Sequence, residues 1–286
     1  MHTDNHTLHD TMTETLNRDI IFADFMNEIH RRANNKSPGP SGFTINMLKS
    51  LPSLTLQALF DSLNELWKSP DQDILPDTWY TRWLCLIPKD KFGPPNIDRI
   101  RPISLFEVIR KVWTSILITR ITRVWKDLNI LHPAQHGYQP NIGTDTELIQ
   151  LLNVIEDAQE HSKPLIMTSY DTAKAFDSVN KSFMETAWVQ LGIPLKTAKY
   201  LVAMDVLGET IIKTPHSSHI LRTKGRSGIT FQTKSTKETV QSFRARDGIG
   251  QGDSPSATAW VAIYDILLHA IDSVTATPYK FTVNDH

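Results

Sequence analysis

The stretch LIMTSYDTAKAFDSV, residues 165–179, decides the expected fold because it runs from a predicted strand through an acidic turn toward a predicted helix. Residues 165–170 are a short apolar run, which predicts a buried β-strand that ends at Asp171. Helical spacing follows over residues 178–191 and stops at Gly192. We therefore expect Asp171 to lie where a buried strand gives way to a helix.

A carboxylate in that position can ligate Mg²⁺, which prefers one or two carboxylates together with substrate phosphates. Two such ions stabilise both the attacking and the leaving oxygen of phosphoryl transfer. The alternative is that Asp171 only caps the helix that begins near Ala175. Asp177 lies six residues further on and is not expected to face the same ion.

The remainder of the chain mixes predicted helices with short strands. Thr144 and Glu147 have the spacing of a capping box at the start of one helix. Helices that are segregated in blocks between strands favour an α+β fold over a doubly wound sheet. Helices are predicted over residues 20–29, 44–50, 54–68, 106–127, 144–160, 197–207 and 257–272, and strands over 83–87, 100–105 and parts of 210–246.

Bulk composition limits the classes of protein that the chain can represent. The 286 residues are 40% hydrophobic and 21% charged, as in a soluble globular protein of one or two domains. The single cysteine, Cys85, excludes an internal disulfide. No uninterrupted apolar run of about 18 residues occurs, so no membrane partner is expected. Residues 1–17 are polar and resemble no secretory signal; we expect them to be disordered or loosely attached.

Basic residues concentrate in two segments of a chain whose net charge is only -1. Between Arg82 and Lys126 there are ten basic and three acidic residues, and between Lys213 and Arg246 there are eight basic residues and one acidic residue. These segments could form a phosphate-facing groove, or they could be solvated faces. Charge alone leaves both interpretations open.

Two further motifs carry candidate chemistry. Residues 247–255, DGIGQGDSP, precede an apolar helix, and their glycines would let the backbone approach a ligand. An ordinary turn capped by Asp253 or Ser254 is the alternative. Residues 86–105 contain a predicted hairpin in which Lys89 and Arg101 could grip a triphosphate, unless the hairpin is simply exposed and basic.

Taken in order, the motifs resemble the reverse transcriptases of LINE-type (non-LTR) retrotransposons over residues 18–286. Each motif alone is moderately specific, whereas six in the right order are highly specific. The residues Ser-Pro-Gly-Pro (37–40) and Ala-Phe-Asp-Ser-Val (175–179) argue against a group II intron maturase or a viral polymerase. The six motifs are Lys36–Phe43 (KSPGPSGF), Leu86–Lys89 (LIPK), Arg101–Leu105 (RPISL), Gln135–Tyr138 (QHGY), Asp171–Val179 (DTAKAFDSV) and Gly250–Asp253 (GQGD).

The resemblance implies roles for five residues of the nucleotide site. Asp171 corresponds to the first metal-binding aspartate of the palm and would hold Mg²⁺, with the backbone carbonyl of Thr172 as a second contact. Phe176 corresponds to the bulky residue that excludes a ribose 2′-hydroxyl, and the motif favours this role over the alternative of a plain core aromatic. Arg101, and less directly Lys89, correspond to the fingers residues that bind the incoming triphosphate.

The resemblance also implies contacts with the nucleic-acid strands. Gln251 and Gly252 correspond to the segment under the new base pair. Gly39, Pro40 and Gly42 belong to a loop near the template. The implied partners are an RNA template, a DNA primer and deoxynucleoside triphosphates. The sequence shows no localisation signal, and a nuclear location is suggested only by the life cycle of the parent element.

The fold implied by the resemblance is a right-hand polymerase without a thumb. Residues 18–164 would form a fingers-like region and residues 165–286 a partial palm. The family's paired aspartates are missing, because no two aspartates are adjacent anywhere in the sequence. One carboxylate cannot by itself hold two Mg²⁺ ions, so we expect the chain alone to lack polymerase activity.

Two other departures from the family pattern stand out. Ser41 occupies a position where the family usually has aspartate, and Pro255 is displaced by one residue after the glycine-rich motif. A remnant that binds nucleic acid without catalysis is therefore the alternative function. Encoding DNA that continues in frame into an aspartate pair and a thumb would favour the enzyme.

Overall fold

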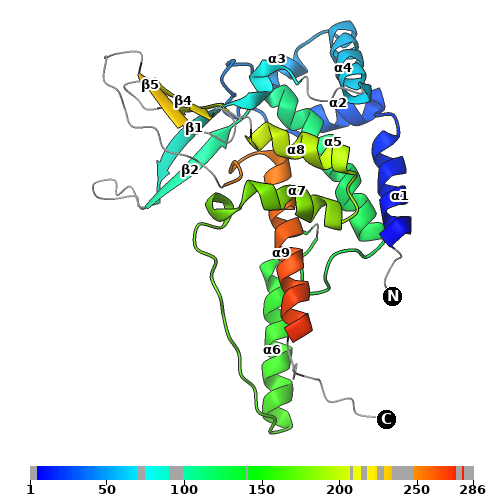
Figure 1. The fold of residues 1–286 in the computed structure, drawn as a ribbon, viewed down its shortest axis with the longest axis vertical. Helices are drawn as coiled ribbons and strands as arrows, with labels where there is room; N and C mark the ends of the chain where they lie inside the picture. Colours follow the sequence, from blue (N-terminus) through cyan, green and yellow to red (C-terminus); the bar gives the residue numbers. More distant parts are fainter. Residues whose placement is uncertain are drawn as a thin grey trace.

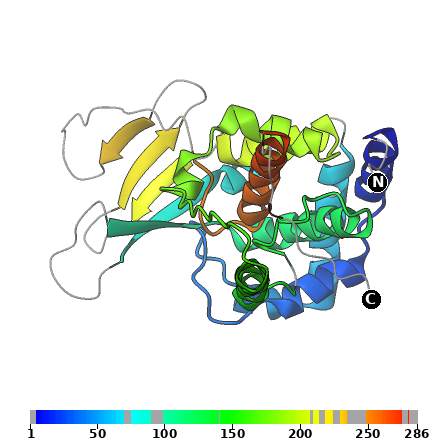
Figure 2. The ribbon, with the colours of Figure 1, turned by 90° about the horizontal axis from the view of Figure 1, so that it is seen from below.

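The protein forms a helical body with a small β-sheet on one side (Figures 1 and 2). The computed structural model describes residues 5–69, 75–89, 99–139, 141–206, 209–213, 218–223, 229–233, 248–274 and 279. Mixed helices and a single small sheet make this an α+β arrangement, as expected. The described helices are α1 (Asn5–Asn17), α2 (Phe22–Arg31), α3 (Ile45–Lys49), α4 (Ser53–Lys68), η1 (Asp77–Tyr80), α5 (Val108–Asp127), α6 (Thr144–Glu160), η3 (Ala175–Ser178), α7 (Lys181–Gln190), α8 (Leu195–Val206) and α9 (Ser254–Val274).

Helix α5 is the centre of the helical body, and α1, α2 and α9 all pack against it. Its side chains Val112, Trp113, Leu117 and Ile121 are almost fully buried. Their three-to-four spacing gives the helix an apolar face, and burying that face provides most of the stabilisation available to a helix of this length.

The N-terminal residues correct a prediction, because residues 5–17 form helix α1 instead of a disordered tail. Leu8, Met12 and Leu16 recur every four residues and are buried in the core. The polar average of this segment conceals one apolar stripe. Gly192 lies beside it; a Cβ at Gly192 would stand 2.5 Å from Cγ of Leu8.

The sheet has five described strands in the order β2-β1-β3-β4-β5. The predicted hairpin is confirmed, since β1 pairs antiparallel with β2. Strand β1 also pairs in parallel with β3, so that Thr81 lies opposite Glu209. The sheet therefore joins residues from both sides of the predicted boundary at residue 164. The strands are β1 (Thr81–Pro88), β2 (Ile100–Leu105), β3 (Glu209–Lys213), β4 (Ser218–Thr223) and β5 (Ile229–Thr233).

The predicted strand at residues 165–170 is wrong. These residues are extended without strand pairing, and Ile166 is 93% exposed. An apolar run forms a stable strand only where a neighbour supplies hydrogen bonds and packing, and none of the described strands pairs with it. Asp171 consequently does not lie at the end of a buried strand.

The helix predicted over residues 178–191 is confirmed as α7 (Lys181–Gln190), which begins three residues later than predicted. The short helix η3 ends at Ser178 and α7 begins at Lys181, where the side chain of Asn180 accepts a hydrogen bond from the amide of Ser182 (2.9 Å). The predicted stop at Gly192 is confirmed, with φ +84° immediately after the last turn.

Helix α6 has the bounds that its sequence predicts, but it lacks the predicted capping box. Gly143 precedes its first residue and no side chain caps it, because Thr144 already lies within the helix. The helix extends away from the body (Figure 1), and Ala158 is its only buried residue. Its apolar side chains Leu148, Ile149, Leu151 and Leu152 are exposed.

Helix α9 requires one correction to the expectation that no segment could cross a membrane. By length and composition alone, residues 254–274 are long and apolar enough to do so. The helix packs against α5 and α7, and buried residues such as Ala259, Ala262 and Asp265 lie along its first three turns. These contacts bury the first half of the helix, whereas Leu267, Ile271 and Val274 in its second half are exposed.

Candidate functional site

The glycine-rich segment 248–252 lies between strand β2 and the turn around η3. The amide of Ser104 donates to the carbonyl of Gln251 (2.7 Å), which ties the segment to β2. On the other side, the amide of Gly248 donates to Val179 (2.7 Å) and that of Ile249 to Phe176 (2.9 Å). Backbone hydrogen bonds thus bring together three motifs that are far apart in the sequence.

Close packing requires glycine at two positions of this segment. A Cβ at Gly252, where φ is +114°, would stand 2.6 Å from the carbonyl oxygen of Ser104. A Cβ at Gly250 would stand 2.5 Å from the ring of Phe106. These two glycines therefore allow the segment to approach β2 and its continuation. At Gly250 and Gly252 the space that a side chain would need is filled by protein atoms, as the alternative of an ordinary glycine-rich turn predicts.

Phe176 is half-buried within a set of aromatic rings. Its ring centroid lies 6.2 Å from that of Tyr138, edge to face, and 6.0 Å from that of Trp260. Trp260 in turn stacks on Tyr264 at 5.7 Å. Tyr138 belongs to the QHGY motif, so this motif contacts the predicted sugar-excluding residue directly.

The tip of the β1–β2 hairpin carries both predicted triphosphate ligands. Arg101 is exposed on β2 opposite Ile87, and the amide of Lys89 donates to the carbonyl of Arg99 (2.8 Å). Lys89 also lies within electrostatic range of Asp177. Partial burial raises the pKa of Asp177, and the charges of Lys174 and Lys89 oppose that effect.

The loop that contains Gly39, Pro40 and Gly42 is attached to the start of α5. A Cβ at Gly39 would stand 2.6 Å from the amide nitrogen of Glu107. The amide of Ser41 donates to Oε1 of Glu107 (2.7 Å) and its hydroxyl donates to Oε2 (2.6 Å). Glu107 thus supplies the carboxylate at this point, which gives a physical context for serine at position 41.

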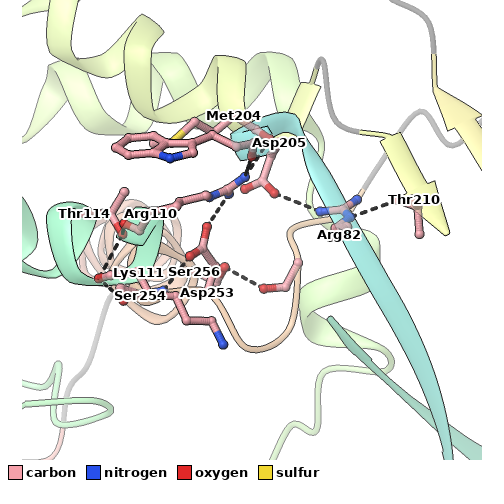
Figure 3. Close-up of polar contacts among 12 residues, drawn as sticks. Arg82, Arg110, Lys111, Thr114, Met204, Asp205, Thr210, Asp253, Ser254 and Ser256 are labelled. Atoms are coloured by element: carbon pink, nitrogen blue, oxygen red, sulfur yellow. Dashed lines mark hydrogen bonds and ion pairs between the residues drawn. The ribbon is translucent and has the colours of Figure 1, made fainter. Parts of the chain in front are cut away.

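A buried ionic pair fixes the end of the glycine-rich segment (Figure 3). Arg110 on α5 pairs with Asp253, and the two side chains are 1% and 0% exposed. The same guanidinium donates to the carbonyl of Trp79 and lies over the ring of Phe106, 4.2 Å from its centroid. Oδ1 of Asp253 accepts the amide of Ser254 (3.0 Å).

A second pair lies beside it. Arg82 on β1 pairs with Asp205 at the end of α8 (3.0 Å), and its Nε donates to Thr210 (2.9 Å). The sequence placed Arg82 and Arg110 in a basic segment that could face phosphate, and both instead have internal carboxylate partners. For Arg110, one feature of the sequence could have indicated burial: it lies three and four residues before Trp113 and Thr114, on the same buried face of α5.

Asp171 and Thr172 are exposed, within the extended stretch that replaces the predicted strand. Among the described residues, no group of three His, Cys, Asp or Glu side chains could hold a metal ion. The described residues therefore do not place a group of acidic ligands for Mg²⁺ around Asp171.

Comparison with known proteins identifies the family to which the chain is similar. The chain matches the family described as reverse transcriptase (RNA-dependent DNA polymerase) over residues 87–279. It is 27% identical over 237 residues to the Retrovirus-related Pol polyprotein from type-1 retrotransposable element R2 of Popillia japonica, covering 83% of this chain and 29% of the relative. It is 24% identical over 144 residues to the RNA-directed DNA polymerase from mobile element jockey of Drosophila melanogaster, covering 50% of this chain and 15% of the relative.

Proposed function

The chain belongs to the reverse transcriptase (RNA-dependent DNA polymerase) family, with relatives among non-LTR retrotransposon proteins, and from this premise we propose that it positions template, primer and nucleotide for RNA-directed DNA synthesis. The family match confirms the resemblance found in the sequence. The chain spans less than a third of the length of either relative.

One observation carries the proposal: the glycine-rich segment is hydrogen-bonded both to β2 and to the residues around Phe176. These hydrogen bonds place the three motifs next to one another, and Gln251 and Gly252 remain accessible at the surface there. Positioning reacting groups in this way accounts for much of phosphoryl-transfer catalysis, in which the protein contributes little covalent chemistry. Gln251 and Gly252 are proposed to lie under the new base pair on that surface.

We assign the incoming triphosphate to the hairpin tip. Arg101 is exposed and offers planar, bidentate donors, and Lys89 adds a compact charge near Asp177. Phe176 is proposed to exclude a ribose 2′-hydroxyl. Its contacts with Tyr138 and Trp260 restrict its rotation, as a steric gate requires.

The two regions are proposed to act as fingers (residues 18–164) and partial palm (residues 165–286). Asp171, with the carbonyl of Thr172, is proposed as one contact of a Mg²⁺ ion, which would also use substrate phosphates. The loop at Gly39, Pro40 and Gly42 is proposed to lie near the template.

A second candidate function is nucleic-acid binding without catalysis. It requires only exposed cations such as Lys89 and Arg101, which lie on the β1–β2 hairpin, and no metal site. Both candidates require binding of an RNA template annealed to a DNA primer, and they differ in whether deoxynucleotides are then incorporated.

Fluorescence anisotropy with a labelled RNA–DNA primer-template tests the shared requirement. We expect binding that weakens steeply as salt rises, because phosphate contacts release counterions. Arg101→Gln should weaken binding of a fluorescent deoxynucleoside triphosphate more than Arg123→Gln, a matched change at an exposed arginine on α5. Absence of primer-template binding at low salt would exclude both candidates. Mg²⁺-dependent incorporation by the purified chain would exclude the non-catalytic one.

A further inference from the structure

We propose that a pocket between α5 and the loop after α2 binds a phosphodiester group of a nucleic-acid strand. The proposal rests on the proposed function and deepens it by assigning a contact for the strand. The cavity has a volume of about 420 Å³, and its lining combines three cationic side chains with apolar ones. Its lining residues are Arg32, Ala33, Lys36, Ser37, Ile45, Leu105, Val108 and Lys111.

The charge of this lining favours an anion. Arg32, Lys36 and Lys111 contribute three positive charges, and the lining contains no acidic residue. The nearby carboxylates are already paired: Glu28 binds Arg32 (2.9 Å) and Asp253 binds Arg110. Glu28 is shared between Arg31 and Arg32 and so offsets part of the charge of Arg32, and the excess positive charge of the pocket comes mainly from Lys36 and Lys111.

Lys111 is the cation least compensated by protein. Among the described residues, its Nζ makes no hydrogen bond or ion pair. Burial lowers its pKa, the charge of Asp253 opposes this, and the charges of Arg32 and Arg110 add to it. A bound phosphate would supply the opposite charge that this ammonium lacks.

Arg32 is held in place and retains a donor without a partner. Its Nη2 donates to the carbonyl of Lys111 (2.7 Å), which fixes the guanidinium beside the pocket. Its Nε is shielded from solvent and has no hydrogen-bond partner in the described structure. Because protein atoms cover this Nε, a ligand would not contact it, and Arg32 contributes its positive charge to the pocket instead.

The position of the pocket favours a strand over a free nucleotide. Ser37 begins the loop that leads to Gly39 and Gly42, the segment proposed to lie near the template. Leu105 directly follows Ser104, which is bonded to Gln251. Apolar side chains beside the cations suit the sugar of a nucleotide whose phosphate the cations bind. The triphosphate ligands Lys89 and Arg101 are not part of this lining.

The test compares Lys111→Met with Lys126→Met in the full chain. Lys126 is exposed on the same helix, about 22 Å away at 1.5 Å per residue. Binding of a fluorescent single-stranded RNA is measured by anisotropy across a salt series. Loss of one phosphate contact should lower the salt slope by about 0.7, which corresponds to about fivefold weaker binding at 0.1 M salt. Lys126→Met should stay near the wild type.

Four outcomes decide the proposal. The expected loss for Lys111→Met, with unchanged binding of a fluorescent deoxynucleoside triphosphate, supports it. Equal RNA binding by the two variants overturns it and leaves the proposed function standing, provided that the wild type binds. Loss confined to the triphosphate assigns the pocket to a free nucleotide and overturns the strand assignment. Failure of the wild type to bind RNA overturns both proposals.

Folding of the variants is checked separately. Replacing a partly buried ammonium by methionine removes a charge that burial disfavours, so Lys111→Met should retain its melting temperature. Should it not fold, Lys36→Gln changes an exposed member of the same lining and carries the same expected loss of RNA affinity.

Discussion

Ser41 donates its hydroxyl to the buried carboxylate of Glu107, across 66 residues of sequence. The contact fixes the loop at Gly39 to the first turn of α5, next to the strand that binds the glycine-rich segment. It also makes the identity of residue 41 depend on residue 107. An aspartate at position 41 would place two carboxylates in contact.

We therefore predict that Ser41→Asp lowers the free energy of unfolding by about 1–3 kcal/mol, because it replaces a donor to a buried carboxylate with a like charge. Ser41→Asp/Glu107→Ser should recover most of this loss, since serine is favoured at the position before α5. Urea unfolding of the wild type, the two single variants and the double variant measures the coupling. Additive effects of the two changes would contradict the prediction.

The pair between Arg110 and Asp253 gives a larger expected effect. Arg110→Met should lower the free energy of unfolding by about 3–5 kcal/mol, because it leaves a buried carboxylate without its cation. Arg110→Met/Asp253→Asn should be more stable than the single variant, since the amide oxygen can still accept the amide of Ser254. Arg123→Gln, at an exposed site, should change stability by less than about 0.5 kcal/mol. Chemical denaturation compares all three, and a double variant no better than the single one would oppose the prediction.

Two glycines should respond in opposite directions to alanine. Gly252→Ala should lower the free energy of unfolding by about 1–3 kcal/mol, because its φ is +114° and the added Cβ would strike the carbonyl of Ser104. Gly137→Ala should raise it by about 0.4–1 kcal/mol, because its φ lies outside the left-handed region and the closest atom is Oε1 of Gln135, at an ordinary contact distance of 3.7 Å. Thermal melts of both variants measure this. Equal shifts in melting temperature would be inconsistent with it.

Asp265 predicts a dependence of stability on pH. Burial raises its pKa, while the amide of His132 (2.7 Å) and the charges of His269 and His132 oppose the shift. A raised pKa means that the folded state holds the proton more tightly than the unfolded state does. This contribution to stability is fully present below the ordinary aspartate pKa of 3.8, and it is lost as pH rises through the folded-state pKa.

Asp265→Asn removes this titration while keeping an acceptor for the His132 amide. Its melting temperature should therefore fall less than that of the wild type as pH rises above about 4, where an unperturbed aspartate loses its proton. Differential scanning fluorimetry from pH 4 to 7 provides the measurement. Parallel curves for the two proteins would refute this assignment.

Much of the fold follows from sequence because apolar spacing and chain punctuation are local. The bounds of α6 and β2 and the stop at Gly192 were predicted in this way. The strand predicted at residues 165–170 is wrong because the apolar run does not itself reveal whether a neighbouring strand is present to pair with it. Helix α1 was missed because three apolar residues at a spacing of four are hidden by a polar average.

The site was predictable only as a set of motifs. The order of the motifs identifies the family, but no spacing indicates that Ser104, Phe176 and Gln251 are connected by backbone hydrogen bonds. Charge counts misplaced Arg110 because the sequence does not reveal that its partner, Asp253, lies 143 residues away. The sequence also does not show why serine occupies position 41, because its partner Glu107 is 66 residues away.

The parallel pairing of β1 with β3 has a consequence for how the chain folds. Strand β1 can pair with β3 only after the ribosome has added the residues up to Glu209, which lies opposite Thr81. At about 5–20 residues per second, a ribosome needs several seconds to add the intervening chain. Throughout that interval the newly made hairpin presents an open edge, to which another nascent copy could add a strand. Expression at high concentration should therefore produce aggregates that arise before the chain is complete.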